Sequence, residues 1–133
     1  MNQEQIALAR RAVARKGFRW LDGMRVLRPD GSLPMRRVGE NAYVHEGSVS
    51  DFKMESATGT MRDDLPDLDD PATLGCLLAL VREAWKDPEI YCAKAWMAGW
   101  AAYSVSYNDQ NLTNDDTFDS EPEALVSALE NAP

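Results

Sequence analysis

The chain has 133 residues, 44% of them hydrophobic, and a formal net charge of −8. This size suits one domain with a single core, so we expect residues 1–133 to fold together. No apolar run reaches the ~18 residues of a membrane span, and the N-terminal residues lack the basic and apolar regions of a signal peptide. The composition therefore argues against a membrane protein.

The charge is unevenly distributed along the chain. Residues 1–37 hold nine Lys or Arg and three Asp or Glu, a net charge of +6, whereas the remaining residues carry −14. Two interpretations follow from this division. Either the basic segment folds against the acidic part and neutralises it internally, or one of the two forms a docking surface for a partner.

The first elements in chain order are a helix and a small meander. Residues 3–16 predict a helix with Ile6, Ala9 and Val13 on one apolar stripe and Gly17 as its C-terminal stop. Between residues 18 and 46, short apolar stretches alternate with turn residues, which is typical of antiparallel strands. Residues 47–70 predict a connecting loop, because they are rich in Ser, Thr, Gly and Asp.

The clearest helix signal follows that loop. Asp70 is placed to cap the helix, Pro71 suits its first position, and Pro88 ends the pattern, so we expect the helix to finish near Lys86. Its apolar residues recur at helical spacing and form one stripe: Leu74, Leu77, Leu78, Val81 and Trp85.

The last third of the chain predicts a strand and a helix. Residues 99–107 alternate like a half-buried strand, and residues 89–96 fit either a helical turn or a strand. Ser120 and Glu123 form a capping box for a helix that ends at Asn131 and turns Ala124, Leu125, Ala128 and Leu129 inward. Together the elements predict an α+β fold, in which a small antiparallel sheet of four or five strands packs against two or three helices.

Motifs for catalysis, cofactors and metals are weak. His45 is the only histidine, and on a strand its neighbour Glu46 would point to the opposite face. The acidic run of residues 63–70 has no glycine, and Pro66 stiffens it, which does not suit a calcium loop. Cys76 and Cys92 lack a metal-binding or disulfide pattern and are expected to be reduced cytoplasmic thiols. We therefore expect no enzymatic activity, no cofactor and no metal.

Three arginines are the sequence evidence in favour of nucleic-acid binding. Arg11, Arg15 and Arg19 recur every four residues and would face phosphates on one side of a helix, with Trp20 nearby to stack on a base. The sequence pI near 4.6 is far from the basic character of a DNA-binding domain. Direct nucleic-acid binding through the basic N-terminal segment is therefore the least favoured alternative, and the three arginines are also candidate contacts for a protein partner.

The acidic run and the tryptophans supply the other candidate contacts. An acidic docking face that imitates a phosphate backbone would use Asp63, Asp64, Asp67 and Asp69. Trp85, Trp96 and Trp100 are typical of a core. An exposed Trp96, with Met97, would instead form an anchor for a partner or a homodimer contact.

Three stretches of the sequence stand out together: Ala7–Ala14 with Arg19–Met24, then Leu65–Trp85, and finally Glu123–Pro133. In this order they resemble a family of short, uncharacterised proteins encoded by tailed phages and prophages. The resemblance implies a phage origin and a place in the host cytoplasm, without implying an activity, a cofactor or a catalytic residue.

We therefore expect a small accessory protein that binds a host or phage protein. The first form is a host-takeover or anti-defence factor, for example an inhibitor of a CRISPR effector. The alternative is a structural or regulatory accessory protein that binds phage components.

Overall fold

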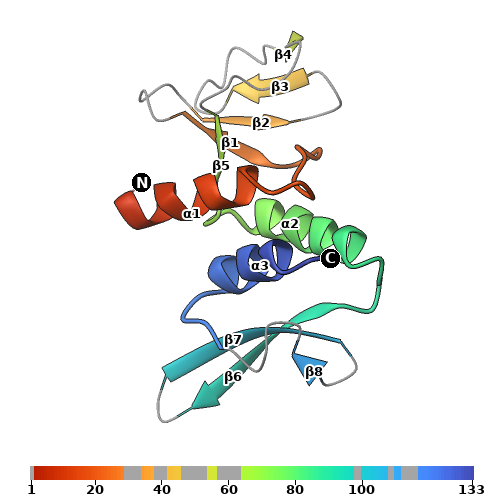
Figure 1. The fold of residues 1–133 in the computed structure, drawn as a ribbon. Helices are drawn as coiled ribbons and strands as arrows, with labels where there is room; N and C mark the ends of the chain where they lie inside the picture. The colour runs from red at the N-terminus through yellow and green to blue at the C-terminus, as the bar shows by residue number, and fades with distance from the viewer. Residues whose placement is uncertain are drawn as a thin grey trace.

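A computed structural model describes residues 2–28, 34–37, 42–45, 54–56, 64–97, 100–107, 110–111 and 117–133. Three helices lie in the middle of the molecule, with a small antiparallel sheet on either side of them (Figure 1). The helices are α1 (Gln3–Val13), α2 (Pro71–Ala84) and α3 (Glu121–Glu130). The strands are β1 (Arg25–Leu27), β2 (Met35–Arg37), β3 (Ala42–His45), β4 (Met54–Ser56), β5 (Leu65–Pro66), β6 (Tyr91–Met97), β7 (Trp100–Tyr107) and β8 (Gln110–Asn111). The predicted α+β class is confirmed, although the strands form two sheets where one was expected.

The first sheet has the strand order β4-β3-β2-β1-β5, and all neighbouring strands are antiparallel. Strands β1 to β3 form the predicted meander, with Val26 opposite Met35. Strands β4 and β5 lie in the segment that was predicted to be a loop. They are only two or three residues long, and pairing with distant strands creates them, so no local alternation marks them. Because β5 pairs with β1, the acidic run lies at the edge of this sheet.

Helix α1 begins at a capping box that was not predicted. The Asn2 side chain accepts a hydrogen bond from the Gln5 amide at 2.8 Å, and the Gln5 side chain accepts one from the Asn2 amide at 2.9 Å. The helix ends at Val13, earlier than expected. Gly17 has no positive φ; a Cβ there would lie 3.1 Å from Leu129 Cδ1. Glycine at this position therefore allows the chain to pass close to α3.

Helix α2 is capped as predicted. The Asp70 carboxylate accepts a hydrogen bond from the Thr73 amide at 2.9 Å, and Pro71 occupies the first helical position. The buried residues of α2 are Thr73, Leu77, Leu80 and Val81, while Leu74 and Leu78 pack partly buried against the core. The predicted stripe is therefore only partly correct: Leu77 and Val81 are buried, but the buried face is rotated toward Thr73 and Leu80, which were not predicted.

Helix α3 is the most deeply buried element. All residues from Ala124 to Leu129 are buried, because α3 contacts α1, α2 and the second sheet (Figure 1). Ser120 is the predicted cap residue, and its hydroxyl accepts from the Glu123 amide at 3.3 Å, which is the first half of the predicted capping box. The Trp85 indole donates a hydrogen bond to the carbonyl oxygen of Ala128 at 2.8 Å. The core is therefore built around α3.

The second sheet has the order β6-β7-β8 and packs against α3. Strands β6 and β7 pair from Tyr91 opposite Ser106 to Met97 opposite Trp100. Residues 91–97 are thus a strand, which resolves the two alternatives for this segment. None of the helices in the described residues has the length and apolar character needed to cross a bilayer.

Candidate functional site

The acidic run is turned toward the arginines of the first sheet. Asp64 accepts from Arg28 Nε at 2.9 Å, and Asp67 accepts from Arg25 Nη1 at 2.5 Å. Only 4% of Asp64 and 7% of Asp67 is exposed. The prediction that these two residues belong to an exposed docking face is therefore wrong, because β5 carries them against β1. Asp63 lies outside the described residues.

Asp70 joins the first sheet to α2. Its two carboxylate oxygens accept hydrogen bonds from Arg36 of β2 at 2.9 Å each, while one of them also accepts from Thr73. Hydrogen bonding by Arg36, helped by Thr73, lowers the pKa of Asp70 to about 2. Arg36 also donates to the carbonyl oxygen of Gly23 at 2.8 Å. These bonds fix the position of the helix start relative to the sheet.

The three arginines spaced four residues apart do not form one open face. Arg11 Nη2 lies 2.5 Å from Glu130 Oε1, Arg15 lies 3.6 Å from the other oxygen of Glu130, and Arg19 pairs with Glu83 at 2.9 Å. Arg15 and Arg19 lie beyond the end of α1, so the predicted helical spacing does not apply to them. Hydrogen bonding to Glu130 raises the pKa of Arg11 despite the opposing effect of burial.

The ion pairs among the described residues share one pattern. Each of the six joins an arginine from residues 11–36 to a carboxylate from residues 64–130. The interpretation that the basic segment neutralises the acidic part internally is thus confirmed for these pairs. The net negative charge of the protein therefore comes from carboxylates outside these six ion pairs.

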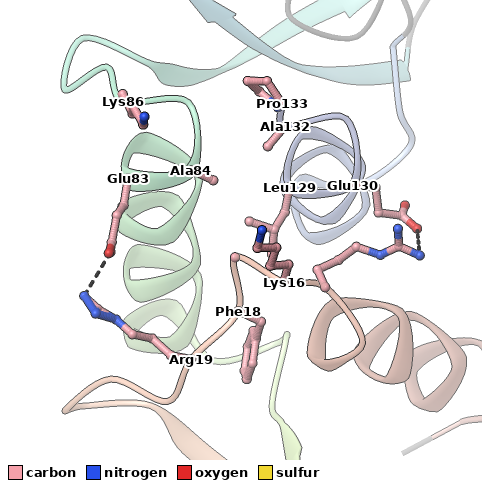
Figure 2. A pocket seen from close by; sticks show the side chains of 12 residues that line it. Lys16, Phe18, Arg19, Glu83, Ala84, Lys86, Leu129, Glu130, Ala132 and Pro133 are labelled. Atoms are coloured by element: carbon pink, nitrogen blue, oxygen red, sulfur yellow. Dashed lines mark ion pairs between the residues drawn. The ribbon is translucent and has the colours of Figure 1, made fainter.

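One groove lies where the C-terminal ends of the helices meet, and it has a volume of about 570 Å³. Figure 2 shows Lys16 and Phe18 between α2 and α3, with the Arg19–Glu83 ion pair at one side. Its two carboxylates, Glu83 and Glu130, are both held by arginines. The lining holds four cations, Arg15, Lys16, Arg19 and Lys86, against these two carboxylates, so the groove is basic on balance although two of its arginines are already paired.

A second groove has a distinctly acidic lining, and we call it the acidic groove. It has a volume of about 600 Å³ and lies between α1, the turn before α2 and the start of α3. Its walls carry four carboxylates, those of Glu4, Asp69, Asp119 and Glu123. Leu8, Leu68 and Pro122 supply apolar surface between them. Of the predicted docking residues, Asp69 and Arg11 line this groove.

Trp96 projects from β6 with 73% of its surface exposed. The Lys94 ammonium lies 5.0 Å from the centre of the Trp96 ring and 5.9 Å from that of Tyr103. Cys92, two residues before Lys94 on the same face of the strand, packs against the core. The core therefore covers the first part of this face and leaves Trp96 uncovered. The side chains of Met97 and Trp100 lie outside the described residues.

The thiols do not point to a reactive site. Burial raises the pKa of Cys92 to about 11, and burial also raises the pKa of Cys76. Both cysteines are free. Within the described ranges, no group of three or more His, Cys, Asp or Glu side chains is arranged to hold a metal ion. The side chain of His45 is not among those described.

The acidic groove was not predicted from the sequence as a unit. Glu4 and Glu123 lie in the first turns of two helices, where acidic residues are common for local reasons. Only the packing of α1 beside α3 brings them together.

No family model, no curated protein and no solved structure matches this chain significantly. The resemblance to short phage proteins therefore stays a prediction.

Proposed function

We propose that this protein acts by binding a partner protein rather than by catalysis, and that the acidic groove receives a basic segment of that partner. The observation that carries the proposal is the convergence of Glu4, Asp69, Asp119 and Glu123 on one groove. They come from separate parts of the chain, so the acidic character arises from the fold and not from one local run. The proposed docking face thus keeps its predicted charge and, of the predicted acidic residues, Asp69, while the other carboxylates come from α1, α3 and the residue before the α3 cap.

The cation in the lining offsets only part of the charge of the groove. Arg11 forms an ion pair with Glu130, and of the groove carboxylates Glu123 also contributes to raising the pKa of Arg11. Asp69 accepts a hydrogen bond from the neutral side chain of Gln5. A protein with a net charge of −8 also attracts a basic partner at longer range, over the roughly 8 Å that salt permits under physiological conditions.

The apolar part of the lining defines the chemistry of the partner further. Leu8, Leu68 and Pro122 lie among the carboxylates. Arg and Lys side chains pack their alkyl stems on apolar surface while their charged ends meet carboxylates. The groove therefore suits a segment that mixes Arg or Lys with apolar residues, more than it suits a simple metal ion or a nucleic acid.

A matched pair of double variants tests the proposal. One removes two charges from the groove, Glu4→Gln with Asp119→Asn, and the other removes two exposed charges elsewhere, Asp22→Asn with Glu89→Gln. The probe is a fluorescent peptide of alternating Arg and Leu, followed by anisotropy over a range of salt concentrations. We expect salt-sensitive binding that is about threefold to tenfold weaker for the groove variant and nearly unchanged for the control.

Equal weakening of both variants would show that the peptide only senses net charge, and the proposal would then fail. Because Glu4 also lies in the first turn of α1, where it favours the helix dipole, urea unfolding must confirm that both variants remain folded at the assay temperature.

The resemblance to phage proteins favours a host or phage protein as the natural partner. Affinity purification from infected cells, with the wild-type chain beside the groove variant, separates the two forms of the proposal. A host defence protein lost from the groove variant supports an anti-defence factor. A virion component lost in the same way supports a phage accessory protein. Recovery of the same proteins by both chains would contradict the role of the groove.

A further inference from the structure

The second sheet ends at strand β6, whose residues Cys92 to Trp96 form an outer edge with no strand partner among the described residues. Strand β6 pairs with β7 over its whole length, from Tyr91 to Met97, and within the described part of the chain it pairs with no other strand. The backbone donors and acceptors along such an edge can pair with a strand of another molecule.

The residues on this edge are unusual for so acidic a protein. Residues 90–97 contain one charged residue, Lys94, and no Asp or Glu. Lys94, Ala95 and Trp96 are all exposed. Two copies of a chain with a net charge of −8 repel each other over most of their surfaces. Strand β6 itself brings no carboxylate to a contact between two copies.

We propose that β6 pairs antiparallel with β6 of a second copy, with Ala95 on the two-fold axis. In this register Lys94 lies opposite Trp96 of the second copy, and Trp96 lies opposite its Lys94. The pair suits this contact, since Lys94 Nζ already lies 5.0 Å from the centre of the Trp96 ring within one chain. A register centred on Lys94 would instead place two ammonium groups opposite each other.

The same register is compatible with a dimer of two-fold symmetry. A two-fold axis perpendicular to the sheet joins β8-β7-β6 to its symmetry mate as one continuous sheet, with α3 of each copy on the same side. Ala95 is small enough for the strands to meet at the axis. Pairing covers Trp96, which is 73% exposed in the single chain. The contact is short, so we expect a dissociation constant on the order of micromolar.

Sedimentation velocity of the full chain over a range of concentrations provides the first test. The mass should rise from the 14.8 kDa of one chain toward twice that value as the concentration increases. Ala95→Asp places two carboxylates opposite each other on the axis, so we expect it to weaken the dimer by at least about tenfold. Its circular dichroism should not change, because Ala95 is exposed in the single chain.

A disulfide trap tests the register with a matched control. In a background of Cys76→Ser and Cys92→Ala, Ala95→Cys should form a cross-linked dimer under mild oxidation. Ala93→Cys on the same face should not, because its two copies would lie roughly 13 Å apart along the strands. A chain that remains monomeric at all concentrations overturns the proposal. Equal cross-linking of both cysteine variants would also overturn it. So would pairing of β6 only with a strand of another protein. Neither test uses the basic peptide, so a failure of the dimer proposal can be distinguished from a failure of the acidic-groove proposal.

Discussion

The guanidinium group of Arg36 holds both carboxylate oxygens of Asp70 at 2.9 Å, while the same carboxylate caps α2 through Thr73. One side chain thus completes a helix start and fastens it to a strand that lies far away in the sequence. A bidentate pair of this kind fixes orientation as well as distance.

Replacing Asp70 should separate these two contributions. Asp70→Asn keeps a capping oxygen but loses the charged pair, and we expect it to lower the free energy of unfolding by about 1–2 kcal/mol. Asp70→Ala loses the cap as well, and we expect a loss of about 2–4 kcal/mol. Urea unfolding measures both. The neighbouring variant Asp69→Ala is the control, since that exposed carboxylate accepts a hydrogen bond from Gln5 but does not cap α2, and its effect should stay below about 1 kcal/mol. A cost for Asp69→Ala as large as that for Asp70→Ala would contradict the assignment.

The stability of the fold should depend on pH through the same carboxylate. The pKa of Asp70 is lowered from 3.8 to about 2 in the folded chain. A lowered pKa means that the unfolded chain takes up the proton first, so the stabilisation is complete above about pH 4 and is lost as the pH falls toward 2. The difference in unfolding free energy between wild type and Asp70→Asn should therefore shrink over this interval. A difference that is constant from pH 5 to pH 2, roughly the span in which linkage acts, would exclude this effect.

Two ion pairs of different exposure should differ in strength. The Asp64 side chain is 1% exposed beside Arg28, whereas the Arg11 side chain is 43% exposed beside Glu130. We expect Asp64→Asn to cost about 2–3 kcal/mol, because it leaves a partly buried guanidinium without its charged partner. Glu130→Gln should cost less than about 1 kcal/mol, because water screens an exposed pair. Thermal unfolding of both variants makes the comparison, and the reverse order of stabilities would contradict it.

Two glycines provide a test of packing. At Gly75, on the exposed side of α2, a Cβ would meet no atom within 4 Å, so Gly75→Ala should stabilise the protein by about 0.5–1 kcal/mol. At Gly17 a Cβ would lie 3.1 Å from Leu129 and 3.3 Å from Ala84, so Gly17→Ala should destabilise it by about 1 kcal/mol. Urea unfolding distinguishes the two signs. Stabilisation by Gly17→Ala would show that Leu129 moves aside freely.

The sequence predicted the helices well because their signals are local. The capping role of Asp70 and the cap of α3 at Ser120 both depend on residues within a few positions of one another. The partners of Asp64, Asp67 and Asp70 could not be predicted in this way. Each lies more than thirty residues away, on or directly after a strand of the first sheet, whose register decides the pairing.

The tryptophans also show that local sequence signals do not predict contacts between distant elements. Trp85 and Trp96 both occur in apolar surroundings, and a core position was the natural prediction for each. Trp85 confirms it, with its indole bonded to the carbonyl oxygen of Ala128, but Trp96 is exposed. The difference depends on how far α3 covers the second sheet. The spacing of residues within β6 does not indicate how far α3 extends over the sheet.

The position of α3 has a consequence for the order of events during synthesis. This helix contacts α1, α2 and the second sheet, and the pair between Arg11 and Glu130 joins residues 119 positions apart. Residues 121–130 must therefore leave the ribosome before Leu77, Val81 and Val105 can be buried in their final surroundings. Until then, both sheets and the first two helices expose apolar surface to solvent. Folding should follow translation of α3 rather than accompany the growth of the chain, and it should be slow for a domain of this size.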